Sequence, residues 1–171
     1  MKLPYGMQDL DKTDLEAVIK VLESDYLTTG PMVPKFEDKI KDVTGSKFAI
    51  ACSSGTSALH LACKAVGIRK GDWVIVPTIT FLATANAVRY CEGNVIFCDV
   101  DPHTGLMTKE TITASIAFAK KENLRLRAII SVHLTGKHAP LDEIKKLADE
   151  YDLKLISDSC HAFGGKFKGR S

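Results

Sequence analysis

The chain has 171 residues, of which 45% are hydrophobic and 26% charged, and its net charge is +2. A chain of this length can form one domain that buries roughly 70% of the surface its unfolded form exposes. The charges are spread without a basic block, which argues against a nucleic-acid-binding protein. No apolar run approaches the ~20 residues that cross a bilayer, and the N-terminus lacks an apolar signal-peptide core. We therefore expect a cytoplasmic protein that binds neither nucleic acid nor membranes.

The cysteines are odd in number and form no Cys-x-x-Cys pair, so a disulfide framework is not expected. Several lie inside apolar runs, which is typical of reduced cysteines that pack as small hydrophobic residues in a cytoplasmic protein. The five are Cys52, Cys63, Cys91, Cys98 and Cys160.

Apolar residues at helical spacing predict two helices near the N-terminus, after an extended arm at 3–6. The first runs from about Lys12 to Ser24 behind the capping residue Asp11. The second opens at Pro34 and ends near Gly45. Its inward-facing residues are expected to be Phe36, Ile40 and Val43.

From residue 47 onward, short apolar runs alternate with amphipathic segments. This alternation predicts an α/β fold with a mostly parallel sheet, helices on both faces and a site along the carboxyl ends of the strands. The expected strands are 47–52, 72–76, 95–98, 126–132 and 153–156. The expected helices are 58–66, 82–91, 108 or 111 to 121, and 141–151.

Two of the strand ends carry polar or aromatic residues that suit a ligand. Ser53–Ser57 lies between a strand and a helix, where free N–H groups and the helix dipole favour a phosphate; a simple capping box explains the same residues. Phe81 lies at the junction between a strand and the next helix, where its face could cover a flat ring or pack in the core. His133 and His138 lack a third residue at metal-ligand spacing.

The last strand is followed at once by Asp158, with Cys160 and His161 close behind. A carboxylate at such a strand end must be hydrogen-bonded or face a cation, because an unpaired buried charge is costly. The protonated ring nitrogen of pyridoxal phosphate (PLP) is one such cation. An aspartate that caps the loop is the alternative.

Five motifs occur along the chain in the order 28–31 (TTGP), 53–60 (SSGTSALH), 77–81 (PTITF), 99–102 (DVDP) and 158–162 (DSCHA). Together they resemble the motifs of the DegT/DnrJ/EryC1/StrS family of sugar aminotransferases, and the resemblance covers the whole chain. The segments 4–6 and 24–31 are most similar to the branch that serves pseudaminic acid biosynthesis by aminating a UDP-linked 4-keto-6-deoxy-N-acetylhexosamine.

The resemblance implies the large domain of an aspartate aminotransferase-like, fold type I enzyme with PLP as cofactor. Residues 1–32 would form an arm and helix, and residues 33–171 a partial PLP-binding domain without the small C-terminal domain. Asp158 would pair with the pyridine nitrogen and His161 would lie near the 3-oxygen of the ring. Gly55 and Thr56 would hold the phosphate, and Phe81 would stack on the ring.

The same resemblance implies the substrates and the assembly. Glutamate would donate the amino group, a nucleotide sugar would accept it, and the full-length protein would be a homodimer. Thr29 would lie near the nucleotide sugar, although the sequence Gly30-Pro31 beside it slightly favours an ordinary turn.

One element of the family pattern is missing. Its Schiff-base lysine follows the aspartate motif at a distance that places it beyond Ser171, and Lys166 and Lys168 fit a basic hairpin instead. Because transamination needs that lysine, we expect the 171 residues alone to bind PLP weakly and to be inactive. The alternatives are a sugar dehydrase of the same family, with histidine in place of the lysine, and a non-catalytic remnant that binds cofactor or nucleotide sugar.

Overall fold

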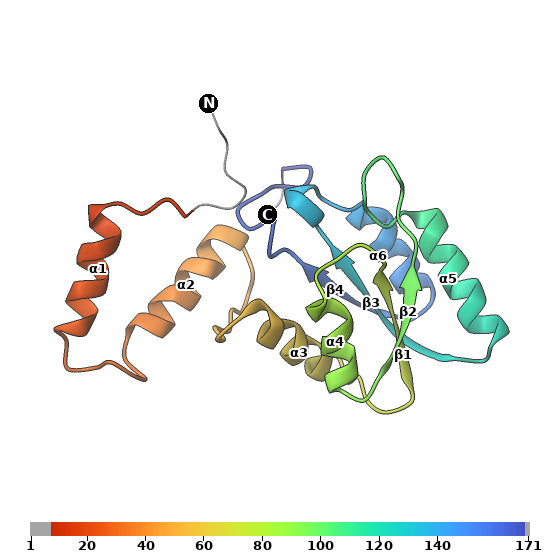
Figure 1. The fold of residues 1–171 in the computed structure, drawn as a ribbon, viewed down its shortest axis with the longest axis horizontal. Coiled ribbons are helices and arrows are strands. Elements are labelled where there is room, and N and C mark those ends of the chain that lie inside the picture. Colours follow the sequence, from red (N-terminus) through yellow and green to blue (C-terminus); the bar gives the residue numbers. More distant parts are fainter. Residues whose placement is uncertain (1–7, 170–171) are drawn as a thin grey trace. The chain divides into compact units, whose positions relative to one another are not determined.

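The computed structural model describes residues 8–169. The chain divides into two compact units, Met1–Ala51 and Cys52–Ser171 (Figure 1). The arm expected at residues 3–6 lies outside the described residues. The division expected after residue 32, between an arm with a helix and a partial PLP-binding domain, stays a prediction.

The first unit contains two helices, α1 (Lys12–Leu22) and α2 (Met32–Thr44). The Asp11 carboxylate accepts hydrogen bonds from the N–H groups of Thr13 (2.7 Å) and Asp14 (3.3 Å), and the Asp14 carboxylate accepts one from the Asp11 N–H. This capping box fixes the start of α1. Gly45 ends α2 in the left-handed conformation with φ 69°, so the predicted cap and stop are both confirmed.

The expected burial in α2 is wrong for two of its three inward-facing residues, whereas Ile40 is half-buried. Phe36 is 57% exposed and Val43 is 37% exposed, so they do not point into a core. The segment 47–52 forms no strand, and Phe48 and Ile50 lie on its exposed surface. A strand needs a neighbouring backbone to bond with, whereas the Ala51 N–H donates to the carboxylate of Glu37 at 2.8 Å.

The second unit is built on a four-stranded parallel sheet with the order β2-β1-β3-β4 (Figure 1). The strands are β1 (Asp72–Pro77), β2 (Asn94–Cys98), β3 (Arg125–Val132) and β4 (Lys154–Asp158). Successive residues of a strand point to opposite faces, and both faces are covered. This explains why these strands read as continuous apolar runs, and it confirms the predicted fold class.

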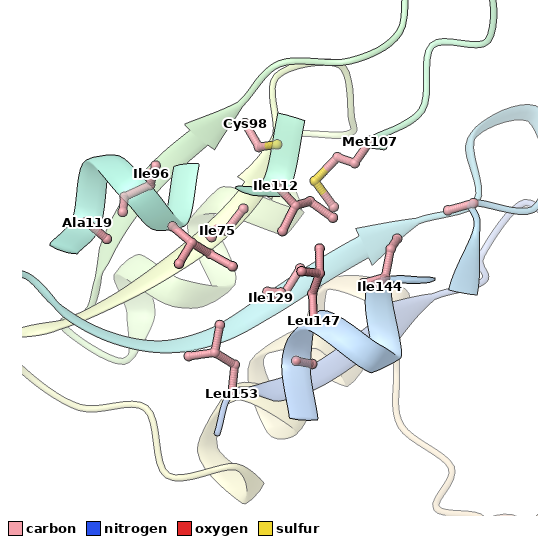
Figure 2. Close-up of a cluster of buried hydrophobic side chains, with 13 residues drawn as sticks. Ile75, Ile96, Cys98, Met107, Ile112, Ala119, Ile129, Ile144, Leu147 and Leu153 are labelled. Atoms are coloured by element: carbon pink, nitrogen blue, oxygen red, sulfur yellow. The ribbon is translucent and has the colours of Figure 1, made fainter. Parts of the chain in front are cut away.

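Helices cover the two faces in pairs. Helices α3 (Gly55–Ala65) and α4 (Ala83–Tyr90) pack on one face, where Val74 and Val76 lie in their core cluster. Helices α5 (Lys109–Lys121) and α6 (Leu141–Glu150) pack on the other. Figure 2 shows side chains of this second cluster, among them Ile75 of β1, Ile112 of α5 and Ile144 of α6. None of the helices within residues 8–169 is long and apolar enough to cross a membrane.

Helix α3 begins three residues earlier than the sequence suggested. Ser54 is its N-cap, and the Ser54 hydroxyl accepts a hydrogen bond from the Ser57 N–H at 3.2 Å. The helix therefore includes Gly55 and Thr56. A short 3-10 helix, Leu134–Gly136, follows β3 and was not predicted.

All five cysteines are free thiols. Cys63, Cys91 and Cys98 are buried, as expected, but Cys52 and Cys160 are exposed. These two lie beside the ends of elements rather than on a face of a helix or strand, so no core forms around them.

Replacing Ile75 by alanine should lower the free energy of unfolding of the second unit by about 2 to 5 kcal/mol, because Ile75 is fully buried against α5 and α6. The matched control is Ile79→Ala, since Ile79 is 51% exposed and its replacement should cost well under about 1 kcal/mol. Urea unfolding, followed by the fluorescence of Trp73, measures both. Equal losses would show that Ile75 does not lie in the core.

Candidate functional site

The strand order reverses between β1 and β3. From β1 the chain passes through α4 to β2 on one side, and it then crosses back through α5 to β3 and β4 on the other. The helices that follow β1 and β3, α4 and α6, cover opposite faces of the sheet, so the loops at the carboxyl ends of these two neighbouring strands diverge. Ligands of open α/β sheets bind in the crevice that this separation creates.

A pocket of about 260 Å³ lies at this position. The structure brings Gly55, Thr56, Phe81, Asp158 and His161 together in its lining. Their individual roles stay predictions. The pocket is also lined by residues that the sequence did not single out as a site, namely Leu59, Ala83, Val132, Leu134 and Cys160.

Thr29 belongs to the other compact unit, in the loop between α1 and α2. Its backbone has φ 53°, and its hydroxyl donates to the Thr28 carbonyl at 2.7 Å. These local contacts explain its place in a tight turn. Its predicted role beside a nucleotide sugar stays a prediction.

Asp158 ends β4 and is only 7% exposed. Among the described residues, its carboxylate receives hydrogen bonds from Cys160 alone, through the Cys160 N–H (3.1 Å to Oδ1) and the Cys160 thiol. A neutral N–H and a weak S–H donor satisfy an ionised carboxylate poorly. The Asp158 carboxylate can therefore accept a strong, charged hydrogen-bond donor from a ligand in the pocket.

The Cys160 thiol lies between Asp158 and the start of α3. The hydrogen bond to the Asp158 carboxylate, together with burial and the negative charge of that group, raises the pKa of Cys160 from 9.0 to about 11. A Cβ added to Gly55 would lie 3.0 Å from the Cys160 Sγ. Glycine at position 55 thus lets the first turn of α3 approach the turn after β4.

The first turn of α3 provides an anion site. The first N–H groups of a helix have no hydrogen-bond partner within the helix. In α3 the Ser57 N–H donates to the Ser54 hydroxyl. The N–H groups of Gly55 and Thr56 have no acceptor among the described residues. The Thr56 side chain lines the pocket beside them. The free N–H groups, the hydroxyl and the positive end of the helix dipole together favour a phosphate.

His161 is held by the turn that follows β3. Its Nδ1 accepts a hydrogen bond from the Thr135 N–H at 3.3 Å, so in the neutral ring the proton is on Nε2. Nε2–H is then the donor that His161 can offer to a ligand. A Cβ on Gly136 would lie 3.1 Å from the His161 carbonyl oxygen, so a small residue is needed there.

Phe81 is 72% exposed in the pocket lining. This exposure excludes the alternative that it is a core residue. The aromatic face remains available to a flat ring, which is the arrangement that the resemblance implies.

The two histidines considered for metal binding lie outside this pocket. The rings of His133 and His138 are in contact, with centroids 4.9 Å apart. Within residues 8–169, no group of three or more His, Cys, Asp or Glu side chains is arranged to hold a metal ion.

Alkylation of Cys160 by iodoacetamide should be slow at neutral pH and accelerate as the pH approaches about 11, because only the thiolate reacts. Asp158→Asn removes the charge that raises this pKa, so the variant should react faster at pH 8. The matched control, Asp99→Asn, changes an exposed carboxyl after β2 and should leave the rate unchanged. Peptide mass spectrometry measures the rates, and equal rates in all three proteins would contradict the thiol–carboxylate contact.

Comparison with known proteins agrees with this geometry. Residues 8–171 match the model of the DegT/DnrJ/EryC1/StrS aminotransferase family. An uncharacterized protein of Methanocaldococcus jannaschii is 38% identical over 168 residues, which are 98% of this chain and 42% of that protein.

Two solved structures illustrate the similarity. NtdA of Bacillus subtilis with bound cofactor PMP is 34% identical, with a TM-score of 0.81 over 89% of this chain and 34% of NtdA. Helicobacter pylori PseC, an aminotransferase involved in the biosynthesis of pseudoaminic acid, is 29% identical, with a TM-score of 0.89 over 100% of this chain and 45% of PseC. The chain thus spans less than half the length of these proteins. It belongs to the DegT/DnrJ/EryC1/StrS aminotransferase family, whose members are PLP-dependent enzymes.

Proposed function

We propose that this chain is the cofactor-binding part of a PLP-dependent aminotransferase. The observation that carries the proposal is the shared pocket of Asp158 and the first turn of α3. A nearly buried carboxylate on one side favours a cationic donor, and a helix start with free N–H groups favours an anion. PLP contains both, in its protonated pyridine nitrogen and its phosphate.

The remaining lining residues also suit PLP. Phe81 offers an exposed aromatic face to a flat ring, and His161 offers Nε2–H to an oxygen atom. Leu59, Ala83, Val132 and Leu134 provide apolar walls. A pocket with apolar walls and a few well-placed polar groups is typical of a cofactor site.

Each residue then has a distinct task. When bound, PLP supplies an electron sink that stabilises negative charge on the substrate carbon. The Asp158 carboxylate holds the proton on the pyridine nitrogen and thereby sustains that capacity. The N–H groups of Gly55 and Thr56 hold the phosphate, Phe81 covers one face of the ring, and His161 donates to the ring 3-oxygen.

We propose further that the whole protein transfers an amino group from glutamate to a nucleotide-linked 4-keto-6-deoxy sugar. The support is family membership, the likeness to PseC and the motif at 28–31, where Thr29 would contact the sugar. The PseC reaction belongs to pseudoaminic acid biosynthesis. A cytoplasmic homodimer is part of the same proposal, and the full reaction is assigned to a protein of the relatives' length.

Equilibrium dialysis of the purified chain against PLP tests the cofactor proposal. Asp158→Asn keeps an oxygen for the Cys160 N–H but loses the charge, so PLP affinity should fall about 10- to 100-fold, the loss expected for a charge-assisted hydrogen bond. Asp99→Asn is the matched control and should bind like the unchanged chain. A chain that fails to bind PLP at millimolar concentration, or equal affinities in the two variants, would contradict the proposal.

Pyridoxal, which has no phosphate, tests the anion site separately. Thr56→Val removes the hydroxyl at the start of α3 and should weaken PLP binding about fivefold or more, the loss of one hydrogen bond. The same variant should bind pyridoxal like the unchanged chain. An equal loss for both ligands would show that Thr56 acts on the fold of the pocket and not on the phosphate.

A further inference from the structure

His133 lies directly behind the pocket, on the face of the sheet that Asp158 does not use. The side chain of His133 is 1% exposed. Its two neighbours in the chain, Val132 and Leu134, line the pocket, whereas His133 does not. The His133 N–H donates to the Asp158 carbonyl oxygen at 3.0 Å. The backbone of His133 is thus bonded to the very residue whose carboxylate faces the ligand pocket.

The His133 ring makes two further hydrogen bonds. Nδ1 accepts from the Ala139 N–H at 3.0 Å, and Nε2 lies 2.9 Å from the Ser157 hydroxyl oxygen. Since an N–H group can only donate, Nδ1 carries no proton. The neutral ring therefore has its proton on Nε2 and donates it to Ser157.

The surroundings favour this neutral form. Burial lowers the pKa of His133, the neighbouring His138 lowers it further, and the Asp158 carboxylate opposes the shift. A proton on Nδ1 would also point at the Ala139 N–H. The hydrogen bonds and the lowered pKa thus both favour the neutral ring in this orientation.

We infer that His133 is a positioning residue for Asp158, an inference that rests on the proposed function. Its backbone holds the Asp158 carbonyl, and its ring holds the side chain of the preceding residue, Ser157. The Ala139 N–H, in the segment before α6, fixes the ring itself. Together these bonds set the direction in which the end of β4 presents the Asp158 carboxylate to the pyridine nitrogen.

Two substitutions separate the two ring contacts. The His133→Asn side chain can place an oxygen near the former Nδ1 and keep the Ala139 bond, but it cannot reach Ser157. The His133→Gln side chain can place an amide N–H near the former Nε2 and keep the Ser157 bond. Ser157→Ala removes the acceptor from an exposed position, so it tests the same contact without changing a buried residue.

Amide hydrogen exchange measured by NMR reads the position of Asp158 without any cofactor. The amide of residue 133 bonds the Asp158 carbonyl, and the Cys160 amide bonds its carboxylate. His133→Asn and Ser157→Ala should each speed exchange of both amides about fivefold or more, the loss of one hydrogen bond. In His133→Gln the two exchange rates should stay within about twofold of those in the unchanged chain. The double variant with His133→Asn and Ser157→Ala should exchange no faster than either single variant.

The PLP dissociation constant provides the second measurement. It should rise at least fivefold in His133→Asn and Ser157→Ala and stay near the unchanged value in His133→Gln.

If the unchanged chain binds no PLP, the proposed function fails, and the exchange rates still decide whether His133 positions Asp158. Equal exchange in the Asn and Gln variants, or no effect of Ser157→Ala, would overturn the inference. If both His133 variants unfold in a thermal melt, Ser157→Ala decides alone.

Discussion

The parallel pairing of β1 with both β2 and β3 is the constraint on which the site depends. It places the carboxyl ends of these strands at one edge of the sheet. It also makes β1 the strand at which the order reverses, with β2 on one side and β3 and β4 on the other. The pocket lies at this reversal. Residues from α3, from the loop after β1 and from the turn after β4, distant in the sequence, become neighbours there.

Close backbone approach at small residues completes this arrangement. Gly55 allows the first turn of α3 to lie against the Cys160 sulfur, and Gly136 allows the turn after β3 to lie against the His161 carbonyl. In both places the space that a Cβ would need is already occupied. The anion-binding end of α3 and the acidic end of β4 can therefore face the same pocket.

Both faces of the sheet contribute to the site in different ways. The face that carries Val132 and Asp158 lines the pocket, while the opposite face carries His133 and Ser157, which bond each other. Along a strand, successive residues alternate between these faces. A side chain that touches no ligand can therefore control the orientation of its neighbour that does, which is the role we assign to His133.

The sequence by itself determined the fold class, the position of the strands in the second unit and half of the residues that line the pocket. Short continuous apolar runs and the polar residues that follow them are local properties, so β1, β2, β3 and β4 could be placed within one or two residues. The motifs around Gly55, Phe81 and Asp158 indicated the family because their spacing follows the same strand ends.

The tertiary structure decided what depends on partners outside the segment. Residues 47–52 have the composition of a strand, but a strand exists only where another backbone pairs with it, and the Ala51 N–H bonds a side chain instead. Phe36 and Val43 follow helical spacing and yet stay exposed, because spacing shows which residues share a face and not what covers it. The bond between His133 and Ser157 likewise required the register of β3 beside β4, since contacts between distant residues arise only when the chain has folded.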